Sequence, residues 1–412
     1  MLGSTDVLLS LCPIEMQRDM KHLFFLITAA VALSVNSCER LDDKVVTSND
    51  GDGDQVMLSD VAEILSQVPL GREQVGEVFD AVSSSAGNGY DEEYLMSDLF
   101  KAPGSGVGDD GMATKGSNSY GNPLRSLIEE YVSGRFRTKA GDADTASVGK
   151  YLRNIISSGM QIYWPYSDEW DGTQLPVITF DPGDGSERNE GYKISVGKDG
   201  VRLVEKVIVD EKMAQERPVW VINNNDDSSF NSLQVIRRTD PEWGTGGGSI
   251  SLTSTTLRTL VLKSIKMNRN YDSWFAGASE FFIKCGSVDD FSASTEAEMK
   301  LYSPTVTDFM IVVKRRQKGI EVPFNVVLVS DWTDQLESCA FMVIEDDGGT
   351  KTTWKCSACV KIKSKSYGFD ISIPFNSSDD IVWRGQLSRR YFERYDQISG
   401  HFGDVDLTFQ II

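Results

Sequence analysis

Histidine is scarce in this chain of 412 residues, which has only His22 and His401. One histidine after residue 37 cannot supply an H-E-x-x-H zinc site or any other two-histidine metal centre. His401 could in principle serve a serine hydrolase, but no G-x-S-x-G nucleophile elbow occurs. We expect His401, in a turn before the last predicted strand, to be a surface residue. These motifs assign no catalytic residue.

Positive charge is also in deficit. The sequence has 41 Lys and Arg against 61 Asp and Glu, a formal net charge of −20. Such a chain repels phosphate backbones, so we expect no nucleic-acid partner. It is also repelled by an anionic membrane surface. Any membrane attachment must therefore come from another source, such as a covalent lipid.

Long hydrophobic runs are absent. The charge-free apolar stretch from Leu23 to Val35 is shorter than the roughly 20 residues that span a bilayer. It follows Met20-Lys21-His22 and fits the positive start and short apolar core of a secretory signal. The acidic residues among the first nineteen do not fit such a signal. We therefore expect residues 1–37 to be a signal peptide whose true start is Met20.

The end of this segment, Val35-Asn36-Ser37-Cys38, resembles the lipobox of bacterial lipoproteins. In that family the cysteine is acylated and becomes the first residue of the mature chain. The acidic residues that follow Cys38 resemble the export signal of surface lipoproteins in the Bacteroidota. The resemblance implies an outer membrane lipoprotein, on the periplasmic or cell-surface face, anchored to the membrane through its lipid. It covers only these residues; the alternative is an ordinary signal peptide with a chance cysteine.

The next part of the chain predicts a tether and then helices. Residues 38–55 are charged and poor in large apolar residues, which is typical of a solvated tether. Apolar residues then recur at helical spacing, first at Val61, Ile64, Leu65 and Val68. Similar stripes continue to residue 156. We predict a small helical domain over 56–159.

From residue 160 the apolar period changes from 3.6 to 2. Short β-branched runs bounded by turn residues predict a β-rich domain over 160–249, which ends in the glycine-rich stretch 244–249. Eight further strand-like runs without intervening helices predict an antiparallel β-sandwich over 250–412. The fold class is therefore α+β, with a small N-terminal helical domain followed by antiparallel β domains.

Four cysteines lie in the predicted sandwich. Asp347-Gly348 is a favoured hairpin turn, and a hairpin closed there places Cys339 opposite Cys356. We predict a Cys339–Cys356 disulfide. Cys359 lies three residues after Cys356 and so on the opposite face of the strand, which leaves Cys285 as its partner in a second predicted disulfide. The alternative is that these cysteines are free buried thiols. The C-x-x-C formed by Cys356 and Cys359 has strand character, which disfavours a redox or zinc site.

Aromatic and acidic residues gather in the segment 161–172. Aromatic faces stack on sugars, and carboxylates accept hydrogen bonds from hydroxyls. The ligand-binding candidates are Tyr163, Trp164, Tyr166, Asp168 and Trp170. The alternative is an aromatic corner of the core.

Acidic residues also fall at presumed loop ends of the sandwich. They are similar to the calcium loops of C2-type sandwiches, where oxygen ligands come from adjacent loops. The candidates are Asp331, Asp346, Asp347, Asp379 and Asp380. No C2 motif is matched, so calcium is retained as a hypothesis and no other cofactor is predicted.

These features favour a lipid-anchored, non-enzymatic protein of the cell envelope that binds a glycan or protein ligand through its β domains. Two alternatives stay open. One is a carboxylate-based glycan hydrolase that uses an acid such as Asp168. The other is a structural component of a surface assembly.

Overall fold

The parts of the chain that can be described begin at Val56. The computed structural model describes residues 56–101, 120–137, 144–197, 200–225, 230–239, 258–392, 395 and 397–412. The predicted signal peptide, Cys38 and the tether lie outside these residues. None of the helices in the described ranges is long and apolar enough to cross a membrane.

The helical part of the chain forms where the apolar stripes predict it. The helices are α2 (Leu58–Gln67), α3 (Arg72–Gly87), α4 (Met96–Leu99), α5 (Leu124–Arg135) and α6 (Thr145–Ile156). Ile64 and Leu65 of α2 are 1% and 0% exposed, so the predicted stripe is a core face. The Asp144 side chain caps α6 by accepting hydrogen bonds from the backbone N–H groups of Ala146 and Ser147. The predicted helices are confirmed except over 91–100, where strand β1 (Glu93–Leu95) precedes the short α4.

These helices pack on a six-stranded sheet with strand order β1-β2-β6-β3-β4-β5. Its strands are β1 (Glu93–Leu95), β2 (Met160–Tyr163), β3 (Val177–Phe180), β4 (Arg188–Val196), β5 (Arg202–Asp210) and β6 (Val219–Asn224). All neighbours are antiparallel except β3 and β6, which run parallel. We call this sheet with its helices the α/β layer.

The central strand β6 is buried on both faces of this sheet. Trp220 and Ile222 share a core with the helices, whereas Val219 and Val221 pack in a second core on the other side. A strand covered on both faces reads as a continuous apolar run, as this segment does. The predicted boundary at residue 159 is therefore wrong, because the helices and the sheet share one core.

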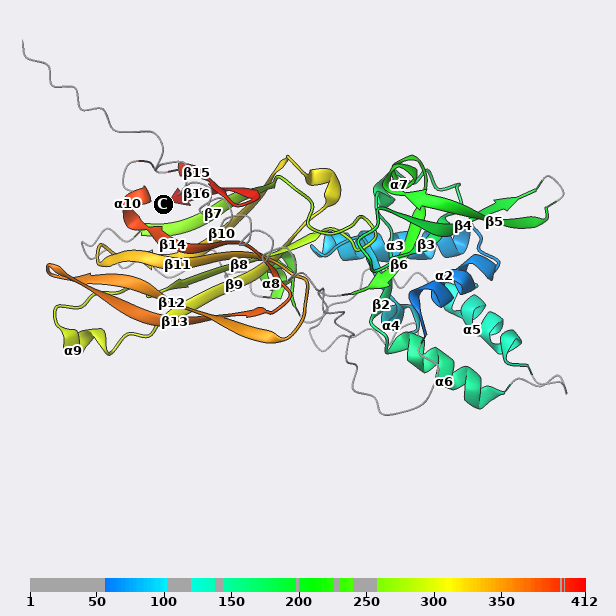
Figure 1. Ribbon diagram of the computed structural model, residues 1–412, viewed down its shortest axis with the longest axis horizontal. Coiled ribbons are helices and arrows are strands. Elements are labelled where there is room, and N and C mark those ends of the chain that lie inside the picture. The colour runs from blue at the N-terminus through cyan, green and yellow to red at the C-terminus, as the bar shows by residue number, and fades with distance from the viewer. Residues whose placement is uncertain are drawn as a thin grey trace, which may run out of the picture. The chain divides into compact units, whose positions relative to one another are not determined.

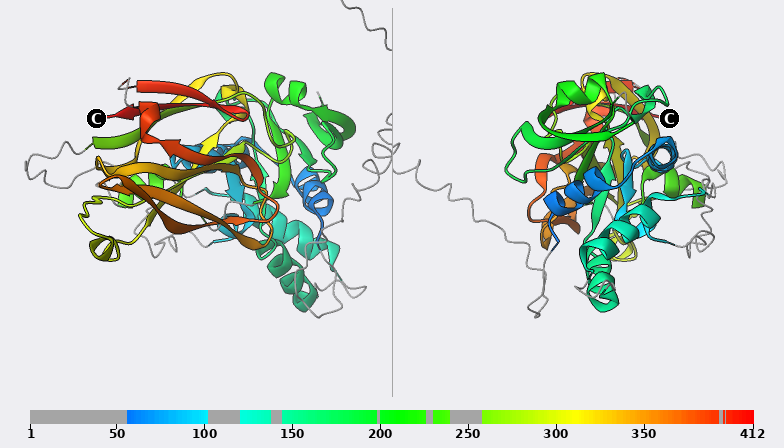
Figure 2. Two further views of the ribbon diagram at one scale, coloured as in Figure 1. Left: turned by 60° about the vertical axis from the view of Figure 1, so that its left-hand side comes forward. Right: turned by 90° about the vertical axis from the view of Figure 1, so that its right-hand side faces the viewer.

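The C-terminal part is an antiparallel β-sandwich, as predicted. One sheet has the order β10-β7-β16-β15; the other has the order β13-β12-β11-β8-β9, with β14 also paired to β11. In Figures 1 and 2 the red β15 and β16 lie in one layer and the orange β12 and β13 in the other. The inner faces bury Leu262, Phe341 and Phe409 completely.

The bounds of the sandwich strands follow. They are β7 (Arg258–Met267), β8 (Ser279–Ser287), β9 (Thr305–Val313), β10 (Glu321–Trp332), β11 (Leu336–Glu345), β12 (Lys351–Ile362), β13 (Lys365–Asn376), β14 (Asp380–Ser388), β15 (Gln397–Phe402) and β16 (Val405–Ile411). Short helices connect the strands of the chain. They are η1 (Ser167–Glu169), α7 (Glu211–Glu216), α8 (Leu233–Thr239), α9 (Glu296–Met299), η2 (Arg315–Gln317) and α10 (Arg389–Phe392).

The predicted hairpin of β11 and β12 forms only at the end far from its turn, where Leu336 pairs with Val360 and Ser338 with Cys359, and this changes the pairing of the cysteines. Strand β14 pairs with β11 along its length and places Leu387, not Cys356, opposite Cys339. Cys356 instead pairs with Ile371, and Cys359 with Gly368, in β13. Cys285, Cys339, Cys356 and Cys359 are all free thiols. The predicted Cys339–Cys356 and Cys285–Cys359 disulfides are therefore absent, because the register assumed for them was wrong.

Candidate metal centre

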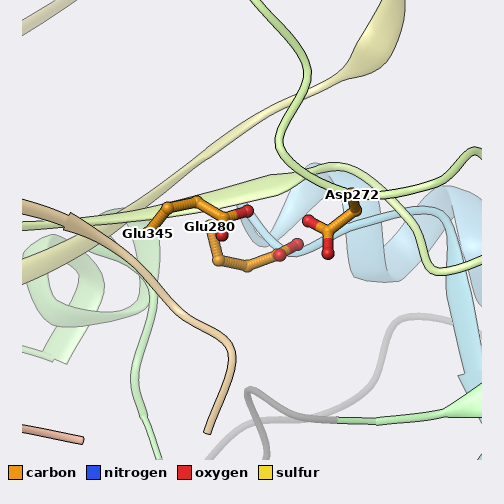
Figure 3. A group of neighbouring side chains, drawn as sticks. All are labelled: Asp272, Glu280 and Glu345. Carbon is orange, nitrogen blue, oxygen red and sulfur yellow. The ribbon is translucent and has the colours of Figure 1, made fainter. Parts of the chain in front are cut away.

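Three carboxylates from different parts of the sandwich converge where its strands end. Asp272 lies in the loop 268–278, Glu280 is the second residue of β8, and Glu345 is the last residue of β11. One carboxylate oxygen from each lies within 4.8 Å of the others. Figure 3 shows the carboxylates of Glu280 and Asp272 pointing toward one another, with Glu345 beside them. We call these three residues the carboxylate cluster.

The carboxylate cluster is largely withdrawn from solvent. Glu345 is 0% exposed and Glu280 is 6% exposed. The Oδ2 atom of Asp272 and the Oδ1 atom of Asn270 are buried without a hydrogen-bond partner among the described residues, as is Oδ2 of Asp346. Buried oxygens without a donor are costly, since each has lost its water. A bound cation would compensate that cost.

Like charges crowd this end of the sandwich. Burial raises the pKa of Asp272, against the hydrogen bond with Glu345 and the charge of Arg315. Burial and the neighbouring acids, Asp272 first among them, raise the pKa of Asp347 to about 7. Burial, together with contact with Asp346, raises the pKa of Asp379 to about 6. Each of these shifts reports an environment that disfavours further negative charge.

The donor set suits a hard cation. Only carboxylate oxygens form the cluster, and oxygen ligands are preferred by Ca²⁺ and Mg²⁺ over the softer transition metals. Oxygens on opposite sides of a Ca²⁺ ion, each about 2.3–2.6 Å from it, lie roughly 4.6–5.2 Å apart. The 4.8 Å limit within the cluster falls in that range. The carboxylate cluster could therefore hold a metal ion.

The acids predicted for calcium are divided by the fold. Asp346 and Asp379 lie together, since contact with Asp346 raises the pKa of Asp379, and Asp347 and Asp380 adjoin them. Oδ1 of Asp346 accepts hydrogen bonds from Gly348 N and Asn376 Nδ2, both at 3.2 Å. Asp331 lies in β10, where its backbone oxygen accepts a hydrogen bond from Asp290 N at 3.1 Å. None of the five predicted acids belongs to the carboxylate cluster; four of them lie near it, and Asp331 lies elsewhere in β10.

Sequence reasoning missed the three residues of the carboxylate cluster. Asp272, Glu280 and Glu345 come from a loop and two strands and have no motif spacing. The one sequence signal for this site was the acidic run Glu345-Asp346-Asp347. The pattern indicates that its first residue, Glu345, is the last residue of a strand and does not indicate a metal ligand. Only strand pairing, which places Phe281 opposite Glu345, brings the cluster together.

Two of the predicted ligand-binding residues are core residues. Tyr163 and Trp164 are 3% and 1% exposed. The Trp164 ring lies 5.9 Å from that of Trp220 and 5.5 Å from that of Trp170. Tyr163 packs in the core on the opposite face of the sheet. Tyr163 was wrongly predicted as a ligand contact. Trp164 belongs to the aromatic corner and forms part of the wall of the hollow described next.

The other three predicted residues reach the surface. Tyr166 and Trp170 are half-buried and line a hollow of about 50 Å³ with Glu169, Gln174 and Gln215. The Tyr166 hydroxyl donates a hydrogen bond to Glu211 at 3.0 Å, and Trp170 Nε1 donates to Gln174 O at 3.1 Å. Asp168 is exposed and forms an ion pair with Arg316. The hollow holds only a few water molecules, so a larger ligand would have to lie across its rim.

His401 is a surface residue, as predicted. Its side chain is 70% exposed, and Nδ1 lies 2.6 Å from Oδ1 of Asp406. The hydrogen bond with His401 lowers the pKa of Asp406. This pair sits on the β15–β16 hairpin, where His401 and Asp406 are register partners.

No protein-family model, no curated protein and no solved structure matches this chain.

Proposed function

We propose that this chain is a lipid-anchored, non-enzymatic protein of the cell envelope whose β-sandwich binds calcium and whose β domains bind a glycan or protein ligand. The anchor is Cys38, in the lipobox-like Val35-Asn36-Ser37-Cys38. Two acyl chains give stable anchoring, which one chain alone does not. The charged segment 38–55 then separates the folded part from the bilayer.

The carboxylate cluster is the observation that carries the calcium part of the proposal. Three carboxylates converge in a largely buried position, and Asp272 keeps a buried oxygen without a hydrogen-bond donor in the described part of the chain. Calcium sites of extracellular modules have dissociation constants of about 10⁻⁴–10⁻³ M. A site of that strength suits a protein outside the cytoplasm.

Ligand binding is assigned to the rim of the Tyr166 and Trp170 hollow. Half-buried aromatic rings beside Glu169 and Gln174 offer a stacking face with adjacent hydrogen-bond acceptors. Stacking of this kind is how proteins bind the apolar faces of sugars. Asp168 forms an ion pair with Arg316. Because this pair favours the ionised carboxylate, we do not assign Asp168 as a general acid.

Retention on a glycan panel tests the ligand assignment. Trp170→Ala should reduce retention, while Tyr395→Ala, which removes a 66% exposed aromatic elsewhere, should not. Equal retention by the two variants would contradict the assignment. Hydrolysis of a panel member that is lost on Asp168→Asn would favour a hydrolase over a binding protein.

Thermal unfolding tests the calcium part. Calcium in the millimolar range should raise the melting temperature, because a ligand that binds only the folded state stabilises it. Glu280→Gln should abolish that increase, and Glu337→Gln, which changes an acid outside the carboxylate cluster, should retain it. An increase that survives Glu280→Gln would place calcium elsewhere.

A further inference from the structure

The loop 268–278 is shared by two parts of the molecule. It connects β7 of the four-stranded sheet to β8 of the six-stranded sheet, so both of its ends belong to the sandwich. Its first half carries Asp272 of the carboxylate cluster. Its second half is buried against the α/β layer.

Trp274 and Phe275 form the apolar contact of this loop with the α/β layer. Both side chains are 0% exposed. They pack in the second core of the α/β layer, on the face of the sheet opposite the helices. The sheet residues of that core include Tyr163, Val177, Val209, Val219 and Val221. The rings of Trp274 and Phe275 lie 4.0 Å apart, and Trp274 Nε1 donates a hydrogen bond to Glu187 O at 3.0 Å.

Backbone groups of the same loop are held by side chains of the α/β layer. Asn223 Nδ2 donates to the carbonyl oxygen of Phe275 at 3.1 Å and also to that of Ala276. Ala278 N donates to Oδ2 of Asp91 at 2.9 Å. A Cβ at Gly277, whose φ is +145°, would lie only 3.1 Å from Asp91. The loop therefore fits closely into the α/β layer.

The other end of the loop faces like charge. Asp272 must approach Glu280 and Glu345, two carboxylates fixed on sandwich strands, for the loop to take this course. Arg315 opposes part of the repulsion by donating from Nη1 to the Asp272 carbonyl oxygen at 2.8 Å. Its guanidinium is otherwise engaged by Glu211, at 2.9 Å from Nε. A cation bound among the three carboxylates would connect the loop to the strands that carry Glu280 and Glu345.

We infer that calcium at the carboxylate cluster fastens the loop 268–278 and through it holds the α/β layer against the sandwich. This inference rests on the calcium site proposed above. Calcium bridges Asp272 to the strands that carry Glu280 and Glu345, so the loop stays closed and Trp274 stays in its core. Without calcium this bridge is missing, so the loop opens more readily and the contact is loosened.

Hydrogen exchange of the full-length folded protein, with and without calcium, tests the inference. The Ala278 amide, which is hydrogen-bonded to Asp91, reports the loop. If opening requires release of the ion, exchange slows by the factor 1 + [Ca²⁺]/Kd, or about elevenfold at ten times Kd. The Leu407 amide, in β16 away from the cluster, should change far less. Magnesium at the same concentration serves as the ion control.

Two variants separate the inference from the function on which it rests. Asp272→Asn should abolish the calcium-dependent slowing, and Asp331→Asn, in β10, should retain it. Trp274→Ala should leave calcium binding measurable by calorimetry while increasing exchange across the contact, at Val219 and Val221 as well as in the loop. If Asp272→Asn does not fold, Glu280→Gln replaces it.

Each outcome has a distinct meaning. Calcium binding without any slowing at Ala278 overturns the inference and leaves the calcium site intact. Absence of calcium binding by the wild-type protein overturns the calcium site itself. Slowing that persists in both cluster variants assigns the effect to a different site and contradicts the inference.

Discussion

Arg315 donates a hydrogen bond from Nη1 to the backbone oxygen of Asp272 at 2.8 Å and pairs through Nε with Glu211 at 2.9 Å. One side chain thus connects the carboxylate cluster of the sandwich with α7 of the α/β layer. The neighbouring Lys314 makes a parallel contact with Glu92, at 2.9 Å. The segment that contains η2 therefore joins the two parts electrostatically, beside the apolar contact of Trp274.

Replacement of Arg315 should be costly for stability. Its side chain is 8% exposed and that of Glu211 is 29% exposed, so Arg315→Ala leaves a partly buried carboxylate without its cation. We expect a loss of about 3 kcal/mol in the free energy of unfolding, the low end for broken buried pairs. Arg188→Ala is the control, because its pair with Asp210 is 3.9 Å long and 72% exposed at the arginine. Urea unfolding should show that Arg188→Ala lowers the free energy of unfolding by less than about 1 kcal/mol. Equal losses in Arg315→Ala and Arg188→Ala would contradict the prediction.

Glu77 gives a prediction about pH. Burial raises its pKa, although its Oε2 accepts a hydrogen bond from Leu124 N at 2.7 Å. Because the folded-state pKa is above the unfolded one, the folded state binds the proton more tightly. The contribution of Glu77 to the free energy of unfolding is therefore fully present at pH values below its unfolded pKa. It is lost as the pH rises through its folded pKa.

Glu77→Gln keeps an acceptor for Leu124 N and removes the buried charge. We expect it to raise the melting temperature at neutral pH and to change it little near pH 4, roughly the unfolded pKa of a glutamate. Glu73→Gln is the matched control, since the exposed Glu73 carboxylate accepts a similar bond from Asn122 N at 3.1 Å. A melting temperature of Glu77→Gln that falls at neutral pH would contradict the prediction.

The cysteines of the sandwich should react as free thiols of unequal access. Cys285 and Cys339 are 0% exposed, and their mutual hydrogen bond, together with burial, raises the pKa of Cys285. Maleimide should therefore label the half-buried Cys356 and Cys359 first, and label all four only after denaturation. Peptide mapping without reduction that recovers a Cys339–Cys356 disulfide would contradict the strand register described for β11.

Lipidation is tested at Cys38. Labelling with a fatty-acid analogue in the cells that make the protein should be lost on Cys38→Ala, while Cys12→Ala should leave it unchanged. The reason is that the thioether to the lipid needs the thiol at the end of the lipobox-like segment. Labelling that persists in Cys38→Ala would exclude this cysteine as the anchor.

The local parts of the fold could be predicted from the sequence. The α2 stripe of Ile64 and Leu65 and the alternation of the last strand both follow from chain periodicity. The partners of these faces could not be predicted. Nothing in the sequence indicates that Trp220 and Val221 face different cores, or that β14 and not β12 pairs along β11, because strand pairing depends on distant segments.

The same limit applies to the candidate site. Asp346, Asp347, Asp379 and Asp380 were predicted as a group because each follows or precedes an apolar strand. Their convergence with Asp272 and Glu280 depends on the loop 268–278, whose course is set by Trp274 in a core of another part of the molecule. Tyr163 and Trp164 were predicted to lie on one surface because they are adjacent in the sequence. In the structure they pack in cores on opposite faces of the sheet.

Isothermal titration of the folded protein with calcium tests the central claim most directly. We expect one saturable site with a dissociation constant on the order of 10⁻⁴–10⁻³ M, the range of extracellular modules. Glu345→Gln should remove the binding heat, and Asp331→Asn should keep it. A wild-type protein that binds no calcium, or a Glu345→Gln variant that binds it as tightly as the wild type, would contradict the assignment of the carboxylate cluster.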